Sequence, residues 1–163
     1  INPFDLKTAL LAKHAQHVVL IHFPIALFIS AVPFDLTAQW TTLRGLTDAA
    51  YYNLLVAAIS TFPVLATGIV AWQFQLEVEI KGALLLHLVL ACISSATIWL
   101  VWWLHFRARR RAEVLSVYRL GIEIVGVCII AFTGYVGGFL SGVNGLVGVA
   151  VFLHFEELGR GFP

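Results

Sequence analysis

Four long apolar stretches, separated by short polar links, dominate the chain. They cover residues 17–38, 51–74, 83–104 and 120–141. Each is long enough, at about 20 residues or more, for a helix to cross the hydrocarbon core of a bilayer. Pro24, Pro33 and Pro63 fall inside these stretches, and transmembrane helices tolerate proline because neighbouring groups satisfy the carbonyls it frees. The pattern predicts four membrane-spanning helices in a single domain, 1–163.

Two further segments are apolar but do not fit a full crossing. Residues 143–155 are too short to span, which indicates a re-entrant or interfacial segment. Residues 1–16 mix Leu and Ala with Lys7 and Lys13, as an amphipathic interfacial helix does. The predicted fold class is therefore all-α: an integral membrane four-helix bundle with an N-terminal interfacial helix and a short C-terminal re-entrant or interfacial segment.

Composition supports a membrane protein and excludes several functional classes. Of the 163 residues, 60% are hydrophobic and only 12% are charged, whereas about a quarter are charged in ordinary soluble domains. The sequence has no Walker loop, no G-x-S-x-G and no H-E-x-x-H, and we expect no nucleic-acid partner. It also lacks C-x-x-C-H, which excludes covalent c-type haem. Cys92 and Cys128 lie in apolar runs, and we interpret them as small buried packing residues.

The basic residues predict the orientation in the membrane. The link between the third and fourth stretches carries Arg107, Arg109, Arg110 and Arg111. The positive-inside rule places this link in the cytoplasm, and these four arginines outweigh the two lysines near the N-terminus. We therefore expect a multi-pass protein of the bacterial inner membrane with both termini in the periplasm.

Histidines at the expected periplasmic side are the main candidates for cofactor chemistry. His22 and His87 lie about five or six residues into the first and third helices, which run parallel. In an up-down-up-down bundle these helices are diagonal neighbours. Two imidazoles facing each other across the core could take both axial positions of one haem. The spacing favours His22 and His87 as ligands of haem b, against the alternative that each is a hydrogen-bonding residue between helices.

The remaining histidines suggest a second site or simpler roles. His17 and His22 are five residues apart, so their side chains differ by about 140° around the helix and cannot share a face. His17, with His154 or His14, could serve a second haem or another metal near the outer surface. We interpret His105, next to the arginines, as an ordinary interfacial residue.

Two acidic residues lie near the predicted cytoplasmic face. Glu123 follows Arg119 by four residues, which predicts an ion pair. Asp35 could pair with Arg119 or with the cytoplasmic arginines. A proton relay is the alternative interpretation of such intramembrane acids. In the fourth stretch, Gly134 and Gly138 are four apart, a spacing typical of close helix packing.

Several motifs resemble the bacterial membrane-protein family catalogued as domain of unknown function 2231. The segment "HVVLIHFPIALFISAVPFDL" (17–36) is similar to the family's N-terminal signature, with His17, His22 and Asp35 at the matching positions. "TGIVAW" (67–72) resembles its threonine-glycine step, and His87 falls where the family carries a histidine. "GYVGGFLSGVNGLVGV" (134–149) resembles its closing glycine-rich stretch.

The resemblance implies a membrane fold but assigns no chemistry. The family's closing stretch usually has histidine before glycine, whereas this chain has Asn144 before Gly145. If that histidine is a ligand elsewhere, either His154 replaces it or the corresponding site is empty here. Family members found beside c-type cytochromes would suit electron transfer at the outer face.

These observations lead to two main hypotheses and a weaker third. The first is a non-catalytic b-type cytochrome subunit of a larger respiratory or photosynthetic complex, exchanging electrons with a periplasmic c-type cytochrome, a quinone or another membrane subunit. The second is a structural subunit that anchors such a complex, without a redox cofactor or with a chlorin. The third is a proton or small-solute conduit, for which the apolar span centres offer few polar groups.

Overall fold

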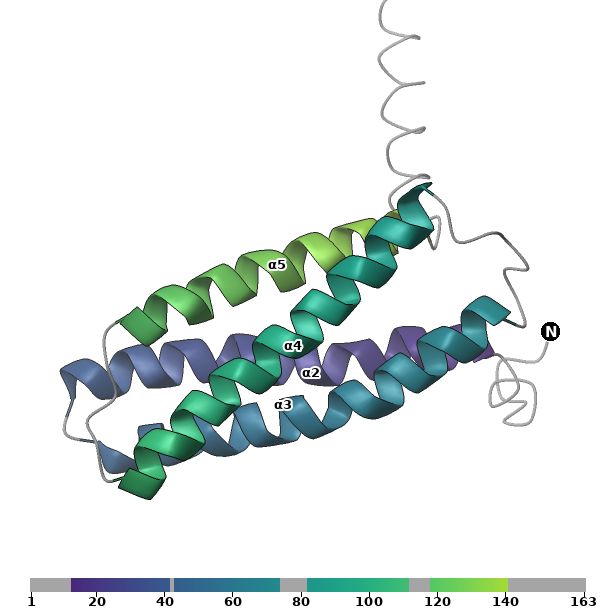
Figure 1. The fold of residues 1–163 in the computed structure, drawn as a ribbon. Coiled ribbons are helices and arrows are strands. Elements are labelled where there is room, and N and C mark those ends of the chain that lie inside the picture. The colour runs from purple at the N-terminus through teal and green to yellow at the C-terminus, as the bar shows by residue number, and fades with distance from the viewer. Residues whose placement is uncertain (1–12, 42, 74–81, 112–117, 141–163) are drawn as a thin grey trace, which may run out of the picture.

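The computed structural model describes residues 13–41, 43–73, 82–111 and 118–140, which form four helices (Figure 1). These are α2 (Lys13–Trp40), α3 (Arg44–Ala71), α4 (Gly82–Arg111) and α5 (Tyr118–Leu140). Each has an apolar segment long enough to cross a membrane. The described residues contain no strand, so the predicted all-α membrane bundle is confirmed. Residues 1–12 of the predicted interfacial helix and the segment 143–155 lie outside the described residues.

The helices are longer than the apolar stretches that predicted them. α3 begins at Arg44 rather than near residue 51, and α4 continues to Arg111 rather than ending near residue 104. Hydropathy marks only the part of a helix that suits lipid, whereas the backbone hydrogen bonds continue into polar sequence. The arginines expected in a link therefore form the last turn of α4, where they complement the negative end of the helix dipole.

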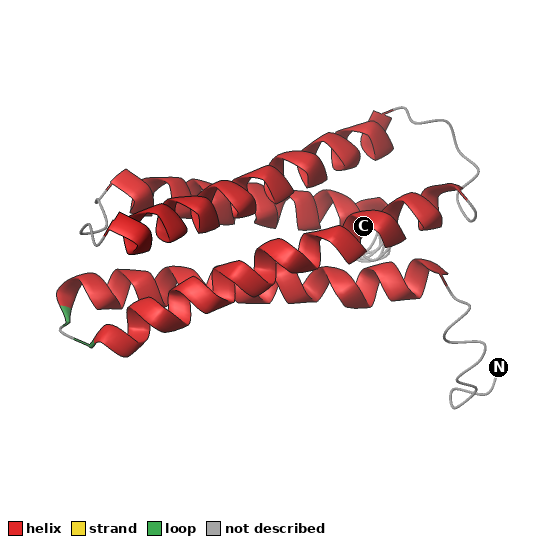
Figure 2. Cartoon of the chain, turned by 60° about the horizontal axis from the view of Figure 1, so that its bottom comes forward, coloured by secondary structure: helices red, strands yellow, loops and turns green. Residues whose placement is uncertain are grey.

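The four helices run alongside one another as two consecutive antiparallel pairs (Figure 2). α2 packs most extensively on α3, and α4 packs most extensively on α5. Further contacts join α3 to α4 and α2 to α5. This order places α2 and α4 diagonally, as the sequence predicted for the first and third helices.

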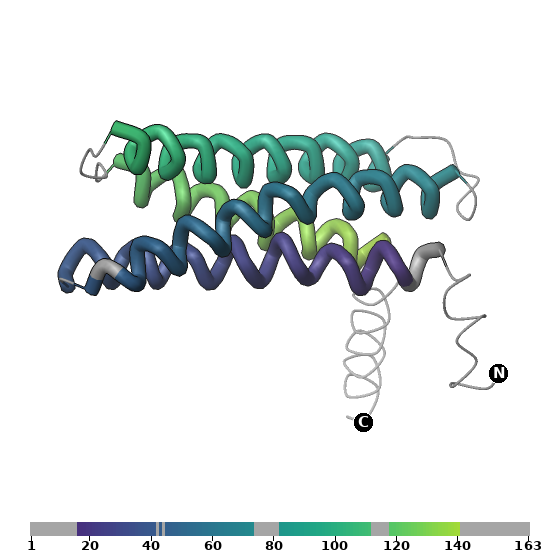
Figure 3. Tube along the Cα trace, turned by 90° about the horizontal axis from the view of Figure 1, so that it is seen from below, coloured from purple at the N-terminus to yellow at the C-terminus, as the bar shows by residue number. Residues whose placement is uncertain are grey.

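The bundle has two chemically different ends. α2 and α4 finish at the end where α3 and α5 begin (Figure 3). We call this the arginine end, after Arg109, Arg110 and Arg111 in the last turn of α4. The opposite end, where α2 and α4 begin, we call the histidine end, after His17 and His87.

The buried positions show that the two helix pairs repeat one another. The buried residues of α2 are spaced by four, three and four, and α4 repeats this spacing 70 positions later. Four buried residues of α3 with the same spacing recur in α5, 69 positions later. In α2 and α4 these positions are Pro24, Phe28, Ala31 and Asp35, matched by Ser94, Ile98, Val101 and His105. In α3 and α5 they are Ala50, Leu54, Ala57 and Thr61, matched by Arg119, Glu123, Gly126 and Ile130.

We refer to these rows as the core seams. A four-three spacing keeps one stripe of each helix facing its neighbours. The outer surface carries many large exposed apolar side chains, such as Phe23 and Phe62, as contact with lipid requires. Cys92 and Cys128 are also exposed. Their interpretation as buried packing residues was wrong, because both lie off the core seams.

Candidate functional site

His17 is fixed against α3 at the histidine end. It lies seven positions before Pro24, so it continues the core seam of α2. Its Nδ1 lies 3.1 Å from the carbonyl oxygen of Val64 and 3.3 Å from Oγ1 of Thr67. The ring packs on Gly68, where an added Cβ would lie 3.0 Å from Cε1. Glycine at this position therefore leaves the space that the imidazole uses.

His87 has the corresponding environment in the second helix pair. It lies 70 positions after His17, and its Nδ1 is 3.2 Å from the carbonyl oxygen of Thr133. An added Cβ on Gly137 would lie 2.8 Å from Cε1 of His87. In both pairs the ring bonds the carbonyl of one residue and packs on the glycine four positions later. The repeat thus builds the same histidine cradle twice.

These hydrogen bonds determine which ring nitrogen can bind a metal. A carbonyl oxygen only accepts, so Nδ1 of His17 and of His87 must donate to it. In the neutral ring, Nε2 then carries the lone pair. Histidines that ligate a metal commonly donate their other nitrogen to a carbonyl or carboxylate, which fixes the tautomer and the ring orientation. Both side chains therefore have the donor arrangement of preoriented ligands.

His22 has a different position from His87. It is exposed on α2, and its Nδ1 donates to the carbonyl oxygen of Val18 in its own helix at 2.7 Å. It is five residues after His17 and therefore lies off the core seam. The structure brings His87 against α5 and leaves His22 on the outer surface, so the two rings have separate surroundings.

Two of the predicted ligands cannot be placed. His14 lies in α2, but its side chain is outside the description. His154 and Asn144 fall in 141–163, outside the described residues. Their part in a second site remains a prediction.

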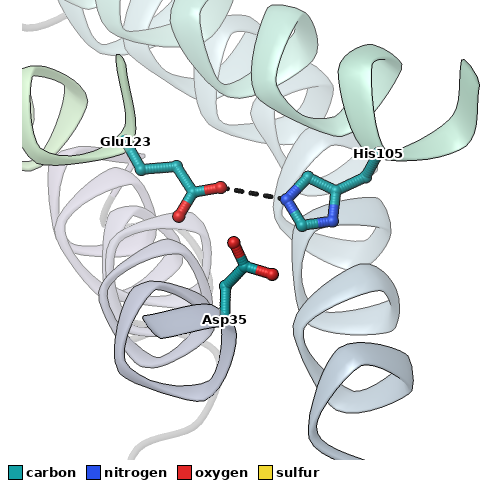
Figure 4. A group of neighbouring side chains, drawn as sticks. All are labelled: Asp35, His105 and Glu123. Atoms are coloured by element: carbon teal, nitrogen blue, oxygen red, sulfur yellow. Dashed lines mark hydrogen bonds and ion pairs between the residues drawn. The ribbon is translucent and has the colours of Figure 1, made fainter. Parts of the chain in front are cut away.

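Four ionisable side chains form a buried cluster at the arginine end, which we call the buried quartet. Its members are Asp35, His105, Arg119 and Glu123, and each is at most 2% exposed. They come from α2, α4 and α5, and three of them are drawn in Figure 4. The fourth, Arg119, donates from Nε to Oε1 of Glu123 at 3.1 Å and from Nη2 to Oδ2 of Asp35. The predicted pair of Arg119 with Glu123 is confirmed, and of the two partners considered for Asp35 the structure shows Arg119.

His105 is part of this quartet, so its interpretation as an ordinary interfacial residue was wrong. Its Nε2 is 2.9 Å from Oε1 of Glu123 (Figure 4). His105 lies 18 residues after His87, just as Asp35 lies 18 residues after His17. Five turns of helix return a side chain to the same face, so both residues continue the core seams.

The quartet also contains a set of potential metal donors. Asp35, His105 and Glu123 each offer one ligand atom within 4.8 Å of the other two, and no other group of three such residues occurs in the described part of the chain. However, the guanidinium of Arg119 already supplies positive charge to both carboxylates. The arrangement is thus a charge network built around arginine.

The sequence contains a signal that would have found these positions. "HVVL" at 17–20 and "HLVL" at 87–90 begin the two repeats. The two segments are offset by 70 residues, and the same offset pairs His17 with His87 and Asp35 with His105. In α5 the glycine that contacts histidine is Gly137, whereas a Cβ added to Gly134, one of the two glycines singled out from spacing, would meet nothing within 4 Å.

Comparisons with known proteins identify a family but no characterised relative. A family model described as "Predicted membrane protein (DUF2231)" matches residues 13–150. No curated protein and no solved structure matches the chain.

Proposed function

The chain belongs to the predicted membrane protein family DUF2231, and we propose that it is a b-type cytochrome subunit in which His17 and His87 bind one haem. The observation that carries this proposal is the repeated histidine cradle on diagonal helices. Each ring has Nδ1 on a carbonyl and glycine beside it.

The residues present suit a haem with two axial histidines. His17 and His87 occupy equivalent seam positions, so they lie at matching depth in the two parallel helices α2 and α4. Gly68 and Gly137 contribute no side chain, so each imidazole can lie directly against the neighbouring helix, which fixes its position. His22 and His87, the pair expected from sequence, remain the alternative ligand pair, and the experiment below includes all three histidines.

When bound, haem supplies one-electron transfer. His17 and His87 would both hold the iron, and a haem held by two histidines would supply electron transfer rather than catalysis on a substrate. The protein would orient the rings through Val64 and Thr133, and its apolar surroundings would help to set the reduction potential.

The arginines support an orientation for this role. Arg109, Arg110 and Arg111 form the last turn of α4, and the positive-inside rule assigns that end to the cytoplasm of a bacterial inner membrane. The histidine end would then face the periplasm. A c-type cytochrome or a quinone could exchange electrons there, within a complex with other membrane subunits.

The test is a reduced-minus-oxidised spectrum with pyridine haemochrome quantification on the purified full chain. We expect one b-type haem in wild type, its loss in His17→Ala and in His87→Ala, and its retention in His22→Ala. Added imidazole should restore binding to the two deficient variants, since it can replace a missing ligand but cannot repair a misfolded bundle.

Two other results would change the assignment. Loss of haem in His22→Ala with retention in His17→Ala would restore the pair expected from sequence. A colourless wild type, prepared with haem available, would overturn the cytochrome proposal and favour a structural anchoring subunit. A pigment that gives no haemochrome would indicate a chlorin.

A further inference from the structure

We propose that the buried quartet at the arginine end binds one exchangeable proton, shared among Asp35, Glu123 and His105. This inference is independent of haem, because the quartet lies 18 residues along α2 and α4 from His17 and His87. At about 1.5 Å per residue, that separation is roughly 27 Å.

The charges of the quartet do not balance without a proton. Two ionised carboxylates and one guanidinium sum to −1, while a neutral His105 adds nothing. All four side chains are at most 2% exposed, so water cannot screen the excess charge. An isolated charge in such surroundings is neutralised or paired rather than left ionised. One proton brings the sum to zero, whereas a divalent metal would leave it at +1.

Among the side chains that the structure describes, no other ionisable group facing the quartet supplies the missing charge. α3 contributes the buried Ala50 and Leu54 at this level of its seam. Its Asp48 is on the surface, where it pairs with Arg109 of α4. Two helices begin and two end here, so the opposite ends of their dipoles offset one another.

The hydrogen bonds show where the proton can reside. Oε2 of Glu123 and Nη1 of Arg119 are buried in the described structure without a hydrogen-bond partner. The 2.9 Å contact between Nε2 of His105 and Oε1 of Glu123 is a hydrogen bond that either atom can donate when it carries the proton. Asp35 offers an oxygen within 4.8 Å of both partners. The proton can therefore pass between His105 and Glu123 along their hydrogen bond, and rotation of side chains would carry it to Asp35.

The surrounding core limits exchange to the arginine end. Asp35 is five residues from the end of α2, and Glu123 is five residues from the start of α5. Towards the histidine end, Phe28, Ala57 and Val101 are completely buried and apolar. This apolar layer separates the quartet from the hydroxyl groups of Ser94 and Thr133. The structure thus favours a proton site open to one side over a continuous conduit.

The test is an infrared pH titration of the full chain in lipid nanodiscs, from mildly acidic to alkaline pH. We read the carbonyl stretch of protonated carboxyl groups together with the ring bands of isotope-labelled histidine. Wild type should lose one proton from a carboxyl group or from His105 as the pH rises. The titration should be absent in Glu123→Gln and in Asp35→Asn, because either change makes the quartet neutral without a proton. Asp48→Asn is the matched surface control and should titrate as wild type does.

Three results would overturn the proposal. One is a wild type with both carboxylates ionised and His105 neutral throughout; this measurement needs no variant, so it stands even if a substitution prevents folding. Another is a titration that persists in both Glu123→Gln and Asp35→Asn. The third is a titration that shifts when choline replaces sodium, which would assign the balancing charge to an alkali cation. None of these results depends on haem content.

Discussion

At the histidine end, His17 and His87 each bond a backbone carbonyl and lie against a glycine of the neighbouring helix. At the arginine end, the seam positions 18 residues later hold Asp35 and His105, which join one network with Arg119 and Glu123. The residues of α3 and α5 that face these seams explain why the two ends of the bundle differ. Gly68 and Gly137 are equivalent, so the histidine end is built twice.

The arginine end breaks that equivalence. Where α5 has Arg119 and Glu123, α3 has Ala50 and Leu54. One helix therefore supplies both signs of charge, and the helices α2 and α4 contribute one residue each to a single cluster. A repeated fold can thus carry two equivalent histidine cradles at one end and one asymmetric cluster at the other. The difference comes from a few substitutions on the same seams.

The largest expected effect comes from removing the positive charge at the arginine end. Arg119→Met leaves Asp35 and Glu123 facing each other without their shared partner, and we expect the bundle to lose about 3–5 kcal/mol of stability. Arg109→Met is the matched control, because its partner Asp48 is on the surface and little change is expected. Reversible unfolding in mixed micelles measures both. Equal stability of the two variants would contradict the expectation that the buried arginine stabilises the bundle more than the surface arginine does.

A smaller effect is expected at the histidine end, where glycine makes room for the ring. Gly137→Ala places a Cβ 2.8 Å from His87, so the ring must leave Thr133, at a cost of about 1 kcal/mol for the hydrogen bond. The higher helix propensity of alanine offsets a similar amount. We expect little net change in stability, yet reduced haem content because the ring is no longer oriented.

The control for this change lies one turn away in the same helix. A Cβ at Gly134 meets nothing within 4 Å, so Gly134→Ala should gain about 1 kcal/mol from helix propensity and keep its haem. Equal haem content in Gly137→Ala and Gly134→Ala would contradict the proposal that Gly137 orients the His87 ring for haem binding.

The smallest effect is expected at the equivalent glycine of the first helix pair. In Gly68→Ala the nearest ring atom of His17 is 3.0 Å from the new Cβ, so a slight shift of the ring suffices. Haem content should fall less than in Gly137→Ala, with Gly45→Ala, whose Cβ is unobstructed, as the control. A greater loss of haem in Gly68→Ala than in Gly137→Ala would contradict the order that the two distances predict.

Sequence reasoning predicted much of the fold and part of each site. It gave four spans, the diagonal placement of α2 and α4, and the pairing of Arg119 with Glu123, because hydropathy and helical spacing are local properties. It left Arg119 and the cytoplasmic arginines as alternative partners of Asp35. It favoured His22 by estimating depth from the start of a span. Depth alone does not say which side of a helix faces the core, and the structure has His22 exposed on α2. The position of His105 beside the arginines in sequence did not reveal its contact with Glu123.

The sequence by itself determined the membrane class and the four spans, since long apolar runs are written in it. The repeat is also visible in "HVVL" and "HLVL", but the buried positions of the structure were needed to recognise it. Only the tertiary structure decided which histidines face glycine and which acids share Arg119. Those relations depend on the rotation and packing of helices that are distant in sequence, with 46 residues separating His87 from Thr133 and 84 separating Asp35 from Arg119.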